Sequence, residues 1–248
     1  MTRSPTHTYD TIPLPSPVSQ ATRPAILPSL ASKYAKMRLE ILLNSPGAFA
    51  SNYGIESKFT PEEWQNRIWR KGVTVFVCVA RPAGIEYMAY SELGQFDGEW
   101  VGAATVFGPI PRDRYQLAPE SGSPETGADG EETKWQTTAL FTSPEHRGQG
   151  LAKSLIDSAK VYARAQTLSD PKINRIRIRM MADPKNNGVA RLYGSLGFID
   201  VARATGREAF LTNGDEALIA AKMGGPEEGR KMMLERFGLV MEYTETLQ

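Results

Sequence analysis

The stretch from Leu140 to Ala152 constrains the fold most, because a strand-like run passes through a glycine-containing turn into an amphipathic helix. Residues 135–142 have the composition of a strand, and residues 148–165 repeat apolar side chains at helical spacing. A strand that feeds a helix through a short turn is a basic unit of α/β proteins. The first amides of such a helix lack intrahelical partners, and the helix dipole adds partial positive charge. The turn therefore predicts a binding site for an anion such as a phosphate.

Three residues set the chemistry of this turn: Arg147, Gly148 and Gly150. The glycines let the backbone approach a phosphate without a clash from a Cβ atom, and Arg147 adds a side-chain charge. The turn can equally serve only to connect two elements, because two glycines alone are a weak signal. A P-loop and a dinucleotide fingerprint are both excluded here, since neither Gly-Lys-Ser/Thr nor the G-x-G-x-x-G spacing occurs in this turn.

The rest of the chain alternates between helical and extended periodicity. We expect helices at 31–43, 60–71 and 187–196, and strands at 73–80, 99–107, 173–181 and 198–204. The second of these helices starts with Thr60-Pro61-Glu62-Glu63, a capping box. Residues 215–224 fit either a strand or a capped helix. Their alanines and terminal glycines favour the helix, which places a second helical piece at about 229–236 and the last strand at 239–244.

Two segments have compositions that argue against packing. The first thirty residues hold six of the 17 prolines, so we expect residues 1–24 to be a disordered tail. The segment 114–133 is rich in Gly, Pro and Ser and acidic in its second half, and we expect a disordered insertion there. Residues 25–248 then form one domain with a helical insertion before the last strand.

Charge and cysteine content narrow the function classes. The 29 Lys and Arg against 28 Asp and Glu leave a net charge of +1, so we expect no bulk attraction to nucleic acid or anionic lipid. Cys78 is the single cysteine, which excludes an intramolecular disulfide and a cysteine-based zinc site. No apolar run reaches the ~20 residues that span a bilayer, and the polar start has no signal core. We expect a soluble protein of the cytoplasm or nucleus that is not secreted.

A second motif, at residues 187–198, reads Asn-Gly-Val-Ala-Arg-Leu-Tyr-Gly-Ser-Leu-Gly-Phe. It resembles the N-x-x-A-x-x-L/F-Y-x-x-x-G-F signature of the GNAT acyltransferase superfamily. Arg147-x-x-Gly150-x-Ala152 is similar to the Q/R-x-x-G-x-G/A coenzyme A loop of the same superfamily. The turn at residues 46–49 also resembles a P-x-A-F turn of many of its members. The coenzyme A loop and the motif at residues 187–198 occur in the order that the superfamily has. The resemblance covers residues 25–204 and the final strand.

The resemblance implies a fold, a reaction and a set of site residues. The fold is a mixed, mostly antiparallel, splayed sheet of about seven strands flanked by helices. The reaction is transfer of acetyl from acetyl-CoA, bound as a cosubstrate, to a primary amine in a ternary complex. Tyr193 is implied as the proton donor to the thiolate, with a core tyrosine as the alternative. The implied coenzyme-binding residues are Leu140, Phe141, Thr142, Arg147, Gly148, Gln149, Gly150, Leu151, Ala152 and Asn187. Asn187 is expected to contact the pantetheine arm, to cap its helix, or both.

The general base cannot be identified in the sequence. The run 135–139 carries no carboxylate at the inward positions where some members of the superfamily have one. Glu92 and Glu99 are candidates, and a water chain is a third. His146, beside the phosphate loop, is interpreted as structural.

The arginines at positions 175, 177 and 179 depart from the superfamily pattern, because they make one face of a strand cationic. Such a face is solvated or paired with acids, or it binds an acidic substrate, a coenzyme phosphate or the acidic insertion.

We expect a small-molecule or peptide amine as the acceptor and no nucleic acid or membrane partner, and a homodimer stays open. One rival interpretation is a GNAT-fold module that binds coenzyme A without turnover. A second rival is a nucleic-acid-binding module, which only the arginine strand supports.

Overall fold

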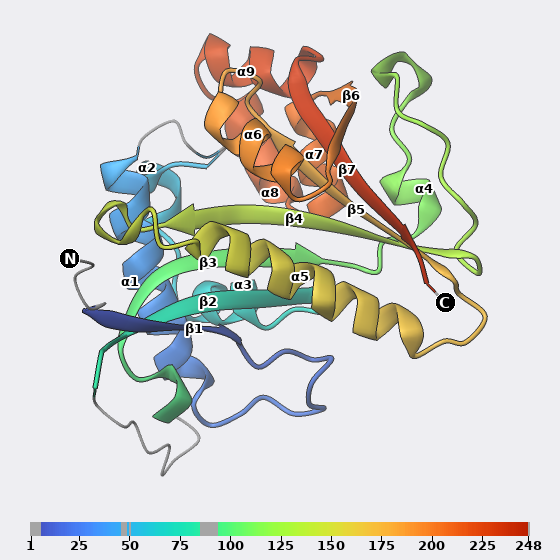
Figure 1. Ribbon diagram of the computed structural model, residues 1–248. Coiled ribbons are helices and arrows are strands. Elements are labelled where there is room, and N and C mark those ends of the chain that lie inside the picture. The colour runs from blue at the N-terminus through green and yellow to red at the C-terminus, as the bar shows by residue number, and fades with distance from the viewer. Residues whose placement is uncertain (1–5, 46–48, 50, 85–93, 248) are drawn as a thin grey trace, which may run out of the picture. The chain divides into compact units, whose positions relative to one another are not determined.

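Within the computed structural model, the described residues are 6–45, 49, 51–84 and 94–247. Seven strands are found among them: β1 (His7–Pro13), β2 (Val73–Pro82), β3 (Glu99–Phe107), β4 (Glu132–Thr142), β5 (Arg175–Ala182), β6 (Ile199–Ala204) and β7 (Gly238–Thr246). They form a sheet in the order β1-β2-β3-β4-β5-β7-β6 (Figure 1). β4 and β5 pair in parallel, whereas β1–β2, β5–β7 and β6–β7 pair antiparallel. The predicted mixed, mostly antiparallel sheet of about seven strands is confirmed.

The helices of the described residues are α1 (Leu27–Asn44), α2 (Tyr53–Glu56), α3 (Pro61–Ile68), α4 (Arg112–Tyr115), α5 (Leu151–Leu168), α6 (Asn187–Ser195), α7 (Gly206–Asn213), α8 (Glu216–Met223) and α9 (Glu227–Leu234). The chain divides into two compact units. The first comprises Met1–Val106 and Ala139–Ala159, and the second comprises Phe107–Thr138 and Lys160–Gln248. β4 and α5 each contribute residues to both units. No helix of the described residues is long and apolar enough to cross a membrane.

The first unit is built from the elements that the apolar pattern predicted. α3 begins with the predicted capping box, in which the amide of Glu63 donates to Thr60 Oγ1 and the amide of Thr60 donates to Glu63. β2 is buried along nine of its ten residues, which explains its continuous apolar run. Cys78 lies in β2 as a buried free thiol, as predicted.

The expectation of a disordered tail is wrong for residues 7–16. β1 pairs with β2 over its whole length, from His7↔Pro82 to Pro13↔Phe76. His7, Tyr9 and Thr11 are half-buried while Thr8 and Asp10 are exposed, which is the alternation of a strand with one solvated face. Pro13 is tolerated because β1 lies at the edge of the sheet. Leu14 and Ser16 are buried beyond the strand.

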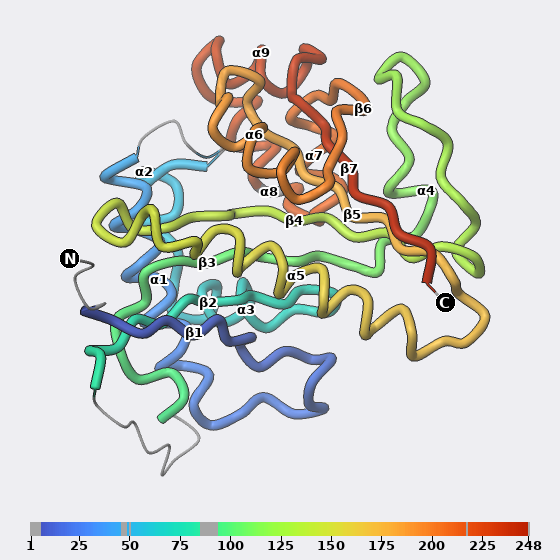
Figure 2. The backbone as a smooth tube through the Cα atoms, in the orientation of Figure 1, coloured from blue at the N-terminus to red at the C-terminus, as the bar shows by residue number. Residues whose placement is uncertain are grey.

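The second unit contains both insertions. Figure 2 follows the chain from β6 through α7, α8 and α9 to β7. This path confirms the helical interpretation of residues 215–224 and the position of the last strand. α7 was not predicted, although Thr205 and Glu208 form a capping box at its start.

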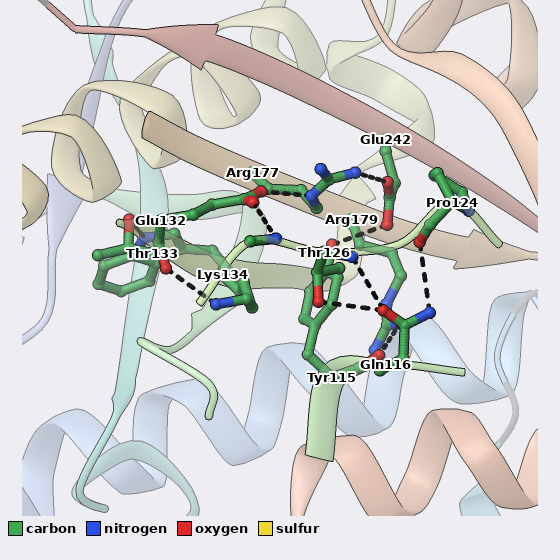
Figure 3. A network of polar contacts seen from close by, with 12 residues as sticks. Tyr115, Gln116, Pro124, Thr126, Glu132, Thr133, Lys134, Arg177, Arg179 and Glu242 are labelled. Carbon is green, nitrogen blue, oxygen red and sulfur yellow. Dashed lines mark hydrogen bonds and ion pairs between the residues drawn. The ribbon is translucent and has the colours of Figure 1, made fainter. Parts of the chain in front are cut away.

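The expectation that residues 114–133 are disordered is also wrong. Tyr115 is fully buried, and Leu117, Ser121 and Thr126 are buried as well. The side chain of Gln116 accepts hydrogen bonds from the amide and hydroxyl of Thr126 (Figure 3). Asp129 pairs with buried Lys134 at 2.9 Å. The segment is ordered because one of its acids pairs with a lysine of β4 and its few large apolar side chains are buried.

Two of the three arginines of β5, Arg177 and Arg179, have partners within the chain. Arg177 forms ion pairs with Glu132 and with Glu242, the latter at 2.7 Å. Arg179 is fully buried and donates to the carbonyl of Tyr115 at 2.7 Å (Figure 3). It also donates to Gln136 Oε1 (2.8 Å) and to Thr212 Oγ1 (3.1 Å). Arg175 is exposed. Pairing with acids is therefore the outcome for Arg177, and Glu132 of the acidic insertion is one of these acids.

Candidate active site

The predicted phosphate-binding turn, residues 147–152, lies in the first unit and is called the cradle below. After a 3₁₀ turn at Pro144–His146, Gly148 and Gly150 adopt φ of 79° and 76°, the left-handed region that side chains disfavour. A Cβ atom at either glycine would meet no heavy atom within 4 Å, so the space in front of both is open. α5 begins at Leu151, and the amide of Ser154 donates to the carbonyl of Gly150. The preceding amides of the first turn have no helical partner.

The side chains around this cradle suit an anion. Arg147, Gly148, Gln149 and Gly150 are exposed, Leu151 is buried below them, and Ala152 is half-buried. Exposed amides at the start of an 18-residue helix, together with an arginine side chain, are the elements of a phosphate site. The fit to a pyrophosphate therefore holds on backbone geometry as well as on composition.

The pairing of β4 with β5 ends before the C-terminal end of β4. Its parallel pairing with β5 runs from Glu132 to Thr137 and no further, although β4 continues to Thr142. Ala139 has a φ of 54° and is the only non-glycine residue in the described part of the chain with a positive φ. Leu140, Phe141 and Thr142 follow it and are half-buried. The end of β4 thus offers backbone groups outside the β4–β5 pairing, as strand addition by an amide-bearing ligand requires.

Tyr193 lies on α6 in the second unit and is 2% exposed. Its hydroxyl is 3.4 Å from Thr137 Oγ1, and Thr137 can donate in turn to the carbonyl of Arg179 at 3.4 Å. Its ring meets Phe198 edge to face at 4.9 Å between centroids. Burial raises the pKa of Tyr193 to about 12, so the phenol is protonated at neutral pH.

Thr137 was not predicted as a functional residue. It is the last residue of β4 in the parallel pairing, and its Oγ1 lies 3.4 Å from the Tyr193 hydroxyl. A threonine within a strand carries no sequence signal of this role, because threonine is common in strands for reasons of shape alone.

The asparagine of the second motif requires a correction. Asn186 caps α6, and its Oδ1 accepts from the amide of Val189 at 3.2 Å. Asn187 is the first helical residue and is exposed, so capping is not its role. Counting the signature back from Tyr193 also places its asparagine at 186, with Val189 at the alanine position. The contact of Asn187 with the pantetheine arm stays a prediction.

Of the two carboxylates considered as general base, the structure describes only Glu99. Glu99 starts β3 with a side chain that is 64% exposed, and its Oε2 is 3.7 Å from Nε2 of His146. Glu92 and the 46–48 turn lie outside the described residues. His146 is buried and accepts or donates a hydrogen bond with the hydroxyl of Tyr9, which agrees with a structural role. In the described ranges, no group of three or more His, Cys, Asp or Glu could hold a metal ion.

The predicted residues thus fall into two groups. The first unit holds the end of β4 and the cradle, residues 140–142 and 147–152. The second unit holds Asn187 and Tyr193, and it brings Tyr193 together with Thr137.

Comparison with known proteins bears on the family and the fold. Residues 113–200 match the family model described as an acetyltransferase (GNAT) domain. The structure of NAA60 from Arabidopsis thaliana with a bisubstrate analogue is similar, with a TM-score of 0.50 and 16% identity over 97% of this chain and 100% of that chain. The same NAA60 with acetyl-CoA gives a TM-score of 0.50 and 16% identity over 96% of this chain and 98% of that chain.

A GNAT-family acetyltransferase from Streptococcus pneumoniae gives a TM-score of 0.52 and 12% identity over 95% of this chain and 100% of that chain. No curated protein matched the sequence. At these identities the structures show the fold. The predicted resemblance to the GNAT superfamily is confirmed by the family model over residues 113–200, and the similar structures show the same fold.

Proposed function

We propose that this protein transfers the acetyl group of acetyl-CoA to a primary amine. The observation that carries the proposal is the Tyr193 hydroxyl, a buried and protonated phenol held at Thr137, where the pairing of β4 with β5 ends. A proton donor in a fixed position is what thioester aminolysis needs as its leaving group departs.

The cosubstrate would bind through backbone contacts. The pyrophosphate would accept hydrogen bonds from the amides of residues 147–152, with Arg147 adding charge. The amides of the pantetheine arm would pair with residues 140–142 by strand addition, and Asn187 would contact the same arm. The ligands of the similar NAA60 structures, acetyl-CoA and a bisubstrate analogue, support this choice of ligand class.

The chemical step balances in the following way. The neutral amine attacks the thioester carbonyl carbon, a C–N bond forms, and the C–S bond breaks. The sulfur takes the Tyr193 proton as negative charge develops on it, and the nitrogen releases one proton. An unperturbed thiol, with a pKa of ~8.5, is a stronger acid than this phenol. The proton from the nitrogen must therefore return to the Tyr193 oxygen in the same turnover, through water or through a base such as Glu99.

Calorimetric titration with acetyl-CoA, followed by thiol release over a panel of amines, tests the proposal. The panel holds peptides with free N-termini, lysine peptides, polyamines and aminoglycosides. We expect binding and a thiol release that depends on the amine. Binding without release for every amine class would instead indicate a module that holds coenzyme A without turnover, and failure to bind would contradict the proposal.

A further inference from the structure

We propose that β1 is a positioning strand for the coenzyme A loop, with Tyr9 and Thr11 as its positioning residues. The inference rests on the proposed function, because it concerns how the loop at residues 147–152 is held ready for its ligand. It assigns a role to the part of the chain that composition alone marks as a tail.

Two hydrogen bonds from β1 bracket the loop. The hydroxyl of Tyr9 is 3.1 Å from Nδ1 of His146, the residue directly before the loop. The hydroxyl of Thr11 is 2.8 Å from Oγ of Ser154, two residues after it. Tyr9 and Thr11 lie on the same face of β1, since residues two apart in a strand share a face. One strand therefore fixes both ends of the phosphate cradle.

His146 is held from a second direction. Its ring is buried, its Nε2 lies 3.7 Å from the Glu99 carboxylate of β3, and the rings of Tyr9 and His146 meet edge to face at 5.8 Å. The backbone amide of His146 also donates to the carbonyl of Ser143. The 3₁₀ turn that precedes Gly148 is thus fixed through its side chain as well as its backbone.

β1 is itself held in the sheet by its contacts with β2. It pairs with β2 over seven residues, and Asp10 forms an ion pair with Arg81 of β2. The guanidinium of Arg81 also donates to the carbonyls of Gln95 and Asp97. The contacts to His146 and Ser154 therefore come from a strand tied into the sheet.

The physical consequence concerns affinity. A loop that contains two glycines loses much backbone entropy when it orders around a ligand. Contacts that hold it in the binding conformation beforehand lower that cost, so they strengthen binding without touching the ligand. Loss of these contacts should raise the dissociation constant for coenzyme A and the KM for acetyl-CoA, while kcat changes little.

Matched substitutions test this. Tyr9→Phe and Thr11→Val each remove one hydroxyl and keep the shape of the side chain. A net hydrogen bond is worth enough to shift binding by about fivefold, so we expect the calorimetric dissociation constant for coenzyme A to rise about fivefold in each. Thr11→Ser, which keeps the hydroxyl, and Thr8→Val, on the exposed face of β1, should bind like the parent protein.

Two further variants remove ambiguity at Thr11. Thr11 also lies opposite Cys78 in the β1–β2 pairing, so Cys78→Ala should leave the dissociation constant unchanged if the contact with Ser154 is the one that matters. Ser154→Ala should reproduce the effect of Thr11→Val. Hydrogen exchange of the amides at 147–153 in the unliganded protein should accelerate in Tyr9→Phe and Thr11→Val, and not in Thr8→Val.

The outcomes separate the two proposals. If the parent protein binds no coenzyme A, the proposed function fails and the role of β1 fails with it. If the parent binds but Tyr9→Phe and Thr11→Val change neither affinity nor loop exchange, only the positioning role of β1 is overturned.

Discussion

Two fully buried tyrosines of the second unit differ in what their hydroxyls meet. Tyr115 donates to the Glu242 carboxylate at 3.1 Å, and the guanidinium of Arg179 lies 3.9 Å above its ring. The hydroxyl of Tyr193 instead meets the neutral hydroxyl of Thr137 at 3.4 Å. Burial raises the pKa of both phenols. Both phenols are protonated at neutral pH, so in the proposed mechanism the partner of each hydroxyl decides whether its proton is committed to the fold or available to a leaving group.

The largest expected effect comes from removing the acceptor of Tyr115. Glu242→Ala leaves Arg177 with one carboxylate fewer and the Tyr115 hydroxyl without its acceptor, in a buried site. Breaking such a buried pair costs about 3–5 kcal/mol, so we expect the free energy of unfolding in urea to fall by that amount. Glu227→Ala, which removes an exposed ion pair with Lys231, should change it by less than about 1 kcal/mol. Equal effects would show that the Glu242 network adds no stability.

Tyr115→Phe isolates the hydroxyl. A hydrogen bond to a charged group contributes about 1.5–3 kcal/mol, so thermal or chemical unfolding should show a loss in that range. Because this phenol is committed to Glu242, kcat should stay close to that of the parent protein. A large loss of kcat at unchanged stability would reverse the roles that we assign to the two tyrosines.

A substitution in the cradle should weaken the binding of acetyl-CoA. Gly150→Val places a β-branched residue at a φ of 76°, which it rarely adopts, so the loop must change shape. We expect the dissociation constant for acetyl-CoA to rise at least about tenfold, or ~1.4 kcal/mol, in calorimetry. Gly122→Val, also at positive φ with open space around it but in the second unit, controls for backbone strain alone. Unchanged affinity in Gly150→Val would place the pyrophosphate elsewhere.

The smallest effect concerns pH. The folded-state pKa of Tyr193, about 12, is above the unperturbed value of ~10, so the folded state keeps its proton where the unfolded state loses it. The stability that the Tyr193 proton contributes is complete below pH ~10 and is lost as the pH rises toward 12. The free energy of unfolding falls over this range by at most ~1.4 kcal/mol per pH unit. The parent protein should therefore lose stability more steeply than Tyr193→Phe between pH 10 and 11. Parallel curves would contradict the raised pKa.

Much of the fold was predictable because its signals are local. Strand periodicity, the capping box at Thr60 and the glycines at 148 and 150 depend on neighbours in the chain, and the structure has them where expected. β1 was missed because the prolines after it dominate the composition, although His7, Tyr9 and Thr11 alternate as in a strand. The order of residues 114–133 was missed because the buried Tyr115 meets its partner Glu242, which is 127 residues away in the sequence.

In the candidate site, too, local features were predictable and contacts between distant residues were not. The turn at residues 147–152 is a local motif, and the structure has its glycines and helix start where the sequence predicts them, while the binding of coenzyme A there stays a prediction. The position of the Tyr193 hydroxyl depends on Thr137, 56 residues away, which no sequence pattern indicates. The helix cap was misplaced at Asn187 rather than Asn186 because two asparagines are adjacent, although the spacing of the signature back from Tyr193 and the backbone at the helix start both distinguish them.

The central claim, that Tyr193 delivers a proton in acetyl transfer, is tested most directly by single-turnover kinetics. Protein preloaded with acetyl-CoA is mixed with a saturating amine substrate, and acetylated product is followed for Tyr193→Phe and Tyr115→Phe side by side. General acid catalysis contributes about 100-fold or more, so we predict that the rate falls by at least that factor in Tyr193→Phe while the affinity for acetyl-CoA is kept. Tyr115→Phe should react within about threefold of the parent protein. A parental rate in Tyr193→Phe would contradict the account and leave Tyr193 as a packing residue.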